Sequence, residues 1–572
     1  MLNVIVLFIF MIAIGNILGI SIGYDKGAVL IKNGKVLIGI TEERISRVPR
    51  DGAFTTKLPL NSIKYCLNYA KLTYDDIDLY VWSALDDKHN YSNAIYELTD
   101  VPKSNIKFIP HHLAHAYAGY ASSPEDETYV LVSDNYGSII NSGGDADNWF
   151  RKYGIETVDT RELPFDWAES TTLYHFNKDG AREVFKNWVQ VSDELKRTNM
   201  ASIYSRAARQ LVFDRDNYTF NIEHLTQLSS YSEPAWEKLQ PEVYSEVEGN
   251  HELIYSNINY SSDFRLKANV AGIYQRDHQK VVGKLIQDVK KSMDINKLSV
   301  IGSLFKNART MHKVMSDFKT LDIHLPLCID DDSISLGCAL WGAWYVSSSN
   351  LKLHTPFLGN PYKDHDAFAS FEELDHIFQN DVREKYFIKK MDTQDELEDE
   401  IVELILNNKI VGVFNGSSEF GIHPLGNRSI LVNPSHRVGL DYMTMKAKEQ
   451  QWWLKHNVMV LKDSLSDVIK KPIKAPTSVL SGKIYAKWKG VVPTIINHKD
   501  EIRYTTSDSS NSTLMQNVLE KFYAKSGIPM ITNIPLSVAL EPMVETPYEA
   551  LRCMYTTKLS ALCVNNVLII RK

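Results

Sequence analysis

The stretch "GAVLIKNGKVLIGI", Gly27 to Ile40, places Asn33 and Gly34 between two runs rich in aliphatic residues. An Asn-Gly pair favours the two-residue turn of a β-hairpin, because both turn positions need a positive φ. An apolar run from Ile17 to Tyr24 precedes this stretch and indicates another strand. We therefore expect a strand followed by a hairpin, all in one sheet.

Further along the chain, apolar runs alternate with helical patterns. The runs "TYVLVSD" and "LSVIGS" predict strands, whereas Leu60 to Ala70 and His278 to Met293 predict helices. This alternation is typical of an α/β fold. The chain becomes polar and rich in turn residues after Ser347, and a second helix and strand pattern follows in "TQDELEDEIVELILNNK" and "IVGVFNG". We predict an N-terminal α/β domain over 17–350, a linker over 351–366 and a C-terminal α/β domain over 367–572.

Composition excludes some classes of function. The 572 residues carry a formal net charge of −7, so no overall basic character points to duplex nucleic acid as a partner. The five cysteines are scattered and odd in number, and no Cys-x-x-Cys pair occurs. This usage indicates a reducing compartment and disfavours a thiolate metal site. We predict a cytoplasmic protein.

The first 24 residues carry no charged side chain, and "VIVLFIFMIAI" is apolar enough for a signal-peptide core or a membrane anchor. However, no Lys or Arg precedes the run, and no cleavage site is clear. We expect residues 1–16 to be an apolar extension, either an extra apolar strand or the product of an upstream start codon, with a signal or weak anchor as the alternative. We expect no membrane partner.

Three histidines fall in "HHLAHAYAGYASSP", residues His111 to Pro124. Pro110 suits a helix start and the alanines favour a helix, so His111 and His115 would share one face while His112 points elsewhere. Two imidazoles on one face can bind one metal ion, although the glutamate of the zinc-protease motif is missing. The alternative is a pair of histidines with ordinary structural hydrogen bonds.

Aspartates follow predicted strands at Asp25, at Asp134 and in "LCIDDD", which contains Asp331. Ligands of α/β proteins bind beyond the carboxyl ends of strands, where such side chains would lie. Turn or helix-capping roles are the alternative interpretation.

Six stretches occur together and in order in one family: "GKVLIGITEERISR", "HHLAHAYAGYASSP", "VSDNYG", "DDDSISLGCAL", "EFGIHPLGNRSIL" and "SGIPMITN". Through them the sequence resembles the O-carbamoyltransferases of the nodulation-factor, cephamycin and aminoglycoside type, over nearly the whole chain. The resemblance implies an actin-like, ribonuclease H-like N-terminal domain related to the threonylcarbamoyladenosine transferase. It also implies a C-terminal domain like threonylcarbamoyl-AMP synthase.

The resemblance further implies an activity. Such an enzyme makes carbamoyl adenylate from carbamoyl phosphate and ATP, its two co-substrates, and transfers the carbamoyl group to a hydroxyl of a sugar, nucleoside or other small metabolite. The matching positions imply a metal site of His111, His115, Asp134 and Asp331, with Asp25, His111 and Asp134 as catalytic residues. Iron is the family's metal, and imidazoles with carboxylates also suit Mn²⁺ or Zn²⁺.

In the second domain, the resemblance implies that one set of residues binds carbamoyl phosphate and the nucleotide. Arg428 offers a planar fork of donors to phosphate oxygens, and Arg503 would be a second phosphate contact. A structural alternative is a buried Arg428–Glu419 ion pair that braces a turn. The full set is Glu419, His423, Asn427, Arg428, His498, Arg503 and Asn533.

Several positions depart from the family pattern. Tyr24 stands where the family has a histidine before Asp25, and Ser417 and His423 stand where it has arginines. Each lost arginine removes contacts worth about 1.5–3 kcal/mol, unless a lysine substitutes. The candidate substitutes are Lys448, Lys455 and Lys489. The alternative function is therefore a catalytically impaired, metal-binding relative that acts as a binding or regulatory partner. A homodimer is the candidate assembly.

Overall fold

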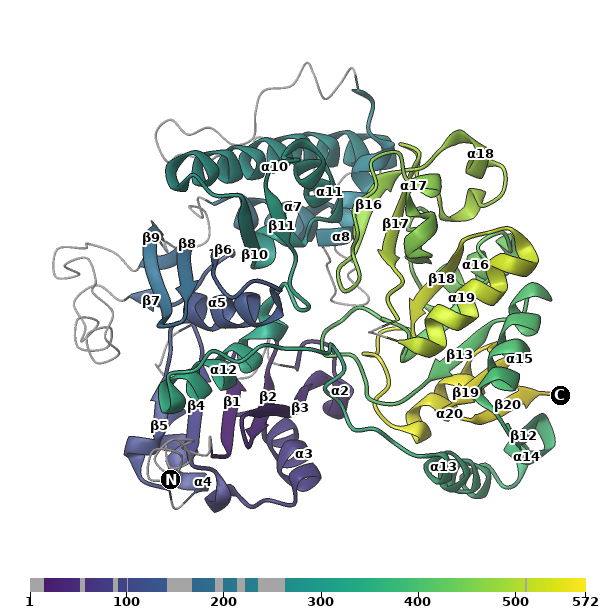
Figure 1. Ribbon diagram of the computed structural model, residues 1–572. Helices are drawn as coiled ribbons and strands as arrows, with labels where there is room; N and C mark the ends of the chain where they lie inside the picture. The colour runs from purple at the N-terminus through teal and green to yellow at the C-terminus, as the bar shows by residue number, and fades with distance from the viewer. Residues whose placement is uncertain are drawn as a thin grey trace, which may run out of the picture.

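The computed structural model describes residues 15–51, 57–85, 91–99, 101–140, 167–190, 199–212, 222–234, 263–509 and 512–572. Most of the apolar extension predicted for residues 1–16 lies outside these ranges. The described residues form three sheets, two in the N-terminal part of the chain and one in the C-terminal part (Figure 1). Within these ranges, no helix is both long enough and apolar enough to span a membrane.

The first sheet has the order β3-β2-β1-β4-β5, with β2 antiparallel to β1 and β3, and β1, β4 and β5 mutually parallel. The predicted hairpin is confirmed, because Asn33 and Gly34 have φ values of 52° and 72° between β2 and β3. The strand β1 ends at Ser21 instead of Tyr24, since the Ser21 hydroxyl donates to the Asp25 carbonyl at 2.8 Å and turns the chain. The strands are β1 (Ile17–Ser21), β2 (Gly27–Lys32), β3 (Lys35–Thr41), β4 (Leu79–Ser83) and β5 (Ile106–Phe108).

The second sheet repeats this topology. Five of its six strands lie in the order β9-β8-β6-β10-β11, with antiparallel pairs β9–β8 and β8–β6 followed by parallel pairs β6–β10 and β10–β11. The short strand β7 also pairs antiparallel with β8. Two copies of one strand order agree with the actin-like domain expected from the sequence. The strands are β6 (Thr128–Ser133), β7 (Ile139–Ile140), β8 (Trp167–Asn177), β9 (Gly180–Gln190), β10 (Lys297–Ile301) and β11 (Asp322–His324).

Two helices lie between the two N-terminal sheets, α5 (His111–Ser122) and α12 (Ile334–Ser347) (Figure 1). They approach closely at Gly337, where a Cβ would lie 1.8 Å from the Ala114 carbonyl oxygen. The predicted helix Leu60 to Ala70 is α3. The other helices of this part are α2 (Glu43–Ser46), α4 (Tyr91–Leu98), α7 (Met200–Val212), α8 (Ile222–Leu228), α10 (Phe264–Met293) and α11 (Ala308–Asp317).

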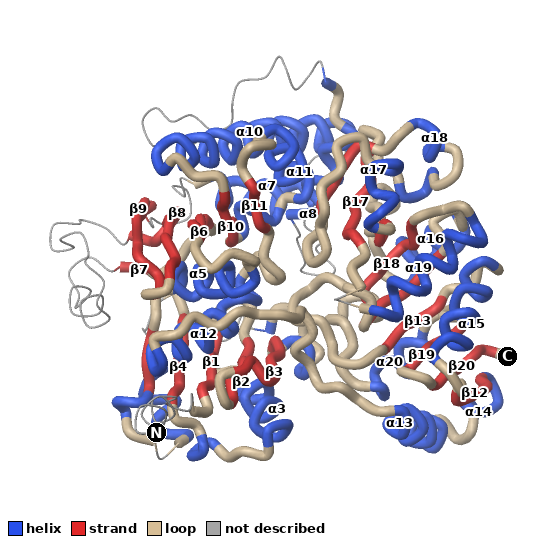
Figure 2. The backbone as a smooth tube through the Cα atoms, viewed as in Figure 1, coloured by secondary structure: helices blue, strands red, loops and turns tan. Residues whose placement is uncertain are grey.

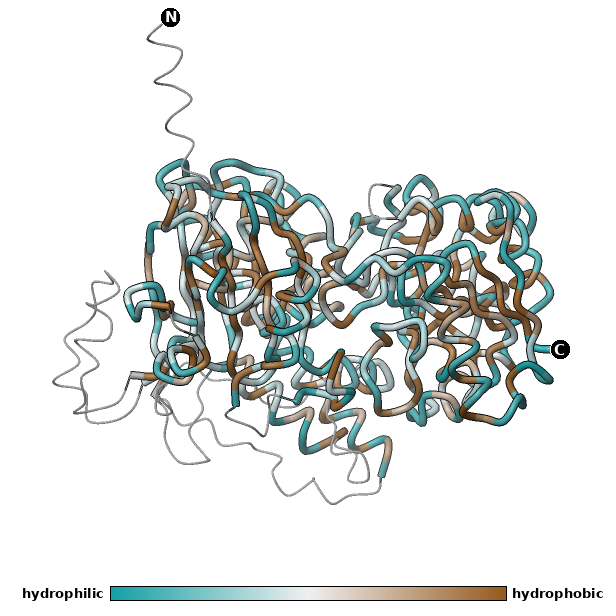
Figure 3. The backbone as a smooth tube through the Cα atoms, turned by 90° about the horizontal axis from the view of Figure 1, so that it is seen from below, coloured by the Kyte–Doolittle hydropathy of each residue, from teal (hydrophilic) through white to brown (hydrophobic). Residues whose placement is uncertain are grey.

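The C-terminal sheet is mixed and has the order β12-β20-β19-β13-β14-β18-β15-β17-β16. Helices pack along it (Figure 2), and apolar segments run through the interior of both halves of the molecule (Figure 3). The strands are β12 (Tyr386–Lys390), β13 (Val411–Phe414), β14 (Arg428–Val432), β15 (Val458–Val460), β16 (Leu480–Lys483), β17 (Glu501–Thr506), β18 (Met530–Pro535), β19 (Ala561–Val564) and β20 (Val567–Arg571). The helices are α13 (Asp364–Ile377), α14 (Asp381–Lys385), α15 (Gln394–Leu406), α16 (Arg437–Tyr442), α17 (Leu465–Val468), α18 (Ala486–Lys489), α19 (Thr513–Ser526) and α20 (Pro547–Thr556).

The two parts of the chain are joined by specific polar contacts from α2. Arg47 donates to the carbonyl oxygens of Met543 at 2.8 Å and Pro542 at 2.6 Å, and Arg44 donates to the carbonyl of Glu419 at 3.1 Å. The motif "EERISR" thus attaches the first sheet to loops of the C-terminal domain. That domain's likeness to threonylcarbamoyl-AMP synthase stays a prediction.

Candidate metal centre and the neighbouring cavities

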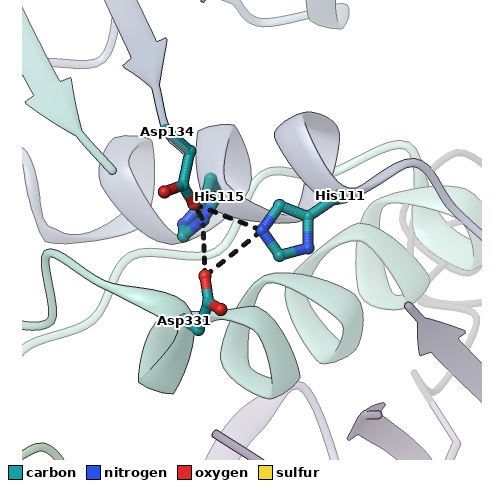
Figure 4. A group of neighbouring side chains, drawn as sticks. All are labelled: His111, His115, Asp134 and Asp331. Carbon is teal, nitrogen blue, oxygen red and sulfur yellow. Dashed lines mark hydrogen bonds and ion pairs between the residues drawn. The ribbon is translucent and has the colours of Figure 1, made fainter. Parts of the chain in front are cut away.

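Four side chains from three parts of the chain meet in one place (Figure 4). His111 and His115 come from α5, Asp134 directly follows β6, and Asp331 begins the turn before α12. His111 Nε2 lies 3.4 Å from Asp134 Oδ2 and 3.3 Å from Asp331 Oδ1. The corresponding distances from His115 Nε2 are 3.2 and 3.5 Å. The structure therefore brings together all four residues expected at the metal site.

The cluster has the dimensions of a metal site. Bonds of about 2.0–2.1 Å to one tetrahedral ion place neighbouring ligand atoms about 3.3–3.4 Å apart, close to the distances between these side chains. Asp331 Oδ1 is buried, and no hydrogen bond reaches it within the described part of the chain. A buried carboxylate oxygen that faces two imidazole nitrogens fits a cation between them.

The pKa shifts of the four side chains also favour a cation at this site. Burial opposes protonation of His111, but the carboxylates of Asp134 and Asp331 outweigh this effect and raise the pKa of His111 to about 10. They also raise the pKa of His115 against the effect of burial. Conversely, burial raises the pKa of Asp134, but the two imidazoles hold it well below its usual value. Without a cation, His111 retains its proton at neutral pH, and a divalent ion would replace that proton.

Neighbouring groups orient the four side chains. His115 Nδ1 lies 2.9 Å from the Ser333 hydroxyl, which leaves Nε2 directed at the cluster. Asp134 Oδ1 accepts from the backbone amide of Asn135 at 2.6 Å and from the Ser303 hydroxyl. Such outer contacts fix ligand orientation in metal sites.

A buried ion pair supports the first turn of α5. Glu169 on β8 accepts from the backbone amides of His112 at 3.2 Å and Ser138 at 3.0 Å, and Lys186 on β9 donates to it at 2.7 Å. The His112 ring turns to the Thr172 hydroxyl at 2.8 Å and away from the cluster, as expected. Sequence reasoning missed Glu169 and Lys186, because nothing local marks either residue as the support of a distant helix.

Asp25 lies near the cluster without being part of it. Burial and the nearby charge of Asp330 raise its pKa to about 8, although Arg50 acts in the opposite direction. Arg50 also donates to the Tyr24 hydroxyl at 2.9 Å. A carboxyl that titrates near neutral pH is able to accept a proton in a reaction.

Glu419 and Arg428 brace the loop between them, but not through an ion pair with each other. Glu419 Oε1 accepts from the backbone amides of Leu425, Asn427 and Arg428 at 2.8–3.1 Å. The fully buried Arg428 guanidinium donates to the carbonyls of Asn415, Gly416 and Asn427 and lies over the Phe414 ring. The N–H groups of Arg428 that were expected to bind phosphate thus donate to backbone oxygens.

The other five predicted nucleotide residues do not form one site. Arg503 forms an ion pair with Glu223 of α8, and His423 Nε2 lies 3.5 Å from the same carboxylate. Asn533 donates to the Pro424 carbonyl at 2.9 Å, and the His498 ring stacks on Tyr231. Asn427 donates to the Ser417 carbonyl at 2.9 Å.

A cavity of about 240 Å³ lies between α2 and the C-terminal sheet. None of the seven predicted nucleotide residues lines it, whereas Lys448, His456, Ser537 and Arg44 do. Lys448 Nζ donates to the Ser537 hydroxyl at 2.8 Å, and burial lowers its pKa to about 8. Of the three lysines named as substitutes, this cavity contains only Lys448.

A second, narrower cavity separates the two domains. Lys306, Asp330, Asp332 and His423 line it, and Ile422 borders both this cavity and the larger one. Asp330 and Asp332 flank the cluster residue Asp331 in the chain. The Lys448 cavity and this second cavity thus share Ile422 in their walls, and the second one is lined by both chain neighbours of Asp331.

Comparison with known proteins relates the chain to carbamoyltransferases. The carbamoyltransferase N-terminus matches residues 16–97, and the carbamoyltransferase C-terminus matches residues 402–571. The chain thus carries both carbamoyltransferase domains. It is 22% identical to the nodulation protein NolNO of Sinorhizobium fredii, over 96% of the chain and 79% of that protein. It is also 22% identical to the uncharacterized protein MJ1051 of Methanocaldococcus jannaschii, over 97% of the chain and 99% of that protein.

Two solved structures are similar to 58% of the chain. One is HypF of T. kodakarensis, with 11% identity, 48% of that chain covered and a TM-score of 0.39. The other is the activator of 2-hydroxyisocaproyl-CoA dehydratase from Clostridium difficile, with 16% identity, 96% of that chain covered and a TM-score of 0.35.

Proposed function

We propose that this protein makes carbamoyl adenylate from carbamoyl phosphate and ATP and transfers the carbamoyl group to a hydroxyl of a sugar, nucleoside or other small metabolite. The observation that carries the proposal is the cluster of His111, His115, Asp134 and Asp331. Its neighbours Asp330 and Asp332 line a cavity that shares Ile422 with the cavity of buried Lys448.

The adenylation step is assigned to the Lys448 cavity. Water would first displace phosphate from carbamoyl phosphate and so form carbamate. A carbamate oxygen would then bond to the α-phosphorus of ATP, and pyrophosphate would leave. Lys448 is mostly protonated at neutral pH, because its pKa is about 8. Its ammonium donates to Pro535 and Ser537 and would exchange some of these contacts for phosphate oxygens. The Arg44 guanidinium, which also lines the cavity, would be a second cation.

The transfer step is assigned to the metal cluster. His111, His115, Asp134 and Asp331 would hold a divalent ion, iron by family resemblance, whose Lewis acidity polarises a bound oxygen. Asp25 would accept the proton of the acceptor hydroxyl as that oxygen bonds to the carbamoyl carbon and AMP leaves. The raised pKa of Asp25, about 8, suits a group that gains and loses a proton at neutral pH.

One observation favours a second candidate function, a metal-binding relative that lacks catalysis and acts as a binding or regulatory partner. The Arg428 guanidinium is committed to three backbone carbonyls, and Ser417 and His423 replace two further family arginines. A nucleotide would then depend on few cationic contacts.

Exchange of labelled pyrophosphate into ATP tests the proposal and separates it from this alternative. We expect exchange that depends on carbamoyl phosphate, and we expect K448Q to lower it at least tenfold through loss of a charge-assisted contact. The control is K489Q, because Lys489 forms a surface ion pair with Asp500 at 2.7 Å. Stoichiometric metal binding without any carbamoyl-dependent exchange would reject the transferase and favour the binding partner.

A further inference from the structure

A third cleft, of about 510 Å³, lies where α10 and α11 face the edge strand β16 of the C-terminal sheet (Figure 1). None of the four cluster residues lines it, and neither does Lys448. Its walls are rich in positive charge although the whole chain is acidic, with a net charge of −7. The cationic side chains along its walls include Arg276, Lys313, Lys470, Lys471, Lys483 and Lys499.

The two acidic residues of this cleft are already neutralised. Glu501 accepts from Arg309 Nε at 2.7 Å, and both side chains are largely buried. Asp317 pairs with Lys313 one turn earlier on α11 and lies 3.7 Å from Lys471. Arg276 is also paired, with Asp277 at 2.6 Å. The excess positive charge of the cleft therefore rests mainly on its lysines.

Two lysines are held side by side by the backbone. The Lys470 amide donates to the Lys483 carbonyl at 2.9 Å, next to the antiparallel bridge between Ile469 and Ile484. Like charges placed side by side on paired segments destabilise the pairing. Both lysines are exposed, and neither has a carboxylate within 4.0 Å in the described ranges. An anion bound between them would remove this repulsion.

We propose that this cleft binds a small phosphorylated molecule that carries several negative charges. Its volume lies in the range of about 300–1,000 Å³ that is typical of small-molecule sites. Lysine ammonium groups on flexible stems suit phosphate oxygens in varied positions. A nucleic acid is disfavoured as the ligand. Proteins that bind nucleic acids carry a basic patch along one face, whereas the positive charge here is gathered in one cleft. The ligand would contact α10, α11 and the C-terminal domain together.

Calorimetric titration of the full chain with inorganic tripolyphosphate tests the proposal. We expect one saturable site, weakened at least tenfold in K470Q/K483Q because two charge-assisted contacts are lost. The matched control is K35Q/K64Q, two exposed lysines of the first sheet and α3. The variant K448Q reports separately on the cavity assigned to adenylation and should leave the cleft site intact.

Three results would overturn the proposal. Binding that is lost in K448Q and retained in K470Q/K483Q would place tripolyphosphate in the adenylation cavity. The absence of saturable binding would remove the site altogether. A short single-stranded RNA that binds more tightly than tripolyphosphate, and is released by K470Q/K483Q, would identify a nucleic-acid surface instead. None of these results depends on carbamoyl transfer. The experiment therefore tests the cleft independently of the proposed function.

Discussion

His115 Nδ1 lies 2.9 Å from the hydroxyl of Ser333, a residue 218 positions further along the chain. This contact joins α5, which carries both histidines, to the turn that precedes α12 and contains Asp331. One hydrogen bond thus sets the orientation of an imidazole and the position of the turn that supplies a carboxylate. The geometry of the cluster depends on the packing of α5 against α12.

Removal of the Ser333 hydroxyl should weaken metal binding. Loss of such an outer contact typically costs about 10–100-fold in metal affinity. We expect S333A to fall in this range in a competition between the protein and a chelating indicator for Zn²⁺. The control is S335A, because the Ser335 hydroxyl is also buried at the start of α12 but has no hydrogen-bond partner within the described residues. Equal affinities of the two variants would contradict the role of Ser333.

Metal binding should release protons near neutral pH. The pKa of His111 rises from 6.5 to about 10 on folding of the metal-free protein, despite the opposing effect of burial. The proton on His111 therefore stabilises the metal-free fold fully below pH 6.5, and this contribution is lost as the pH rises through about 10. A metal needs neutral imidazoles, so its affinity should increase over the same interval. Titration calorimetry in two buffers of different ionisation enthalpy counts the released protons, and a count of zero would contradict the assignment.

Elements with strong local signals could be predicted from the sequence. Asn33-Gly34 determines the hairpin, and Pro110 with the following alanines marks the start of α5. The start of α10 could not be placed, since the helix begins at Phe264, where Asp263 caps it, instead of His278. Its buried face contains the polar residues Gln275 and Asp277, which hide the helical periodicity. The hairpin of β8 and β9 was missed for the same reason, because Glu169 and its neighbours are polar and buried.

The same distinction applies to the candidate site. His111 and His115 could be paired by helical spacing, and Asp134 by its place after a strand, because both signals are local. The environment of Arg428 could not be foreseen, since the carbonyls that occupy its guanidinium come from a loop whose path depends on Glu419 and three backbone amides. Lys448 reaches its cavity through contacts with Pro535 and Ser537, far away in the chain. No local pattern contains that information.

The ion pair beneath α5 should contribute strongly to stability. Lys186 counters the burial of Glu169 and keeps its pKa near 2, and the Glu169 side chain is fully buried. K186M would leave this carboxylate buried without a partner, which typically costs about 3–5 kcal/mol of unfolding free energy. E183Q removes only the second, partly exposed partner of Lys186, so it should cost less than about 1 kcal/mol. Urea unfolding followed by tryptophan fluorescence measures both, and a K186M loss as small as that of E183Q would contradict the prediction.

Acid should remove the contribution of the Glu169–Lys186 ion pair to the free energy of unfolding. Because the folded pKa of Glu169 is depressed from 4.5 to about 2, its charge stabilises the fold above pH 4.5, and this stability is lost as the pH falls through about 2. The difference in stability between E169Q and the unchanged protein should therefore shrink as the pH falls below 4.5. Urea unfolding at a series of acidic pH values measures it. A difference that stays constant with pH would show that the Glu169 charge is not involved.

The attachment of the C-terminal domain should depend on Arg47. Its guanidinium donates to the carbonyls of Met543 and Pro542 and pairs with Glu541, three residues that line the Lys448 cavity. R47A would release this loop, so we expect faster proteolysis within 536–546 and a KM for ATP raised roughly tenfold or more, since small displacements of binding groups are costly. R437A is the control, because Arg437 forms an exposed pair with Asp441. Metal affinity should be unchanged in both variants, and proteolysis of R47A at the rate of R437A would show that Arg47 does not hold the loop.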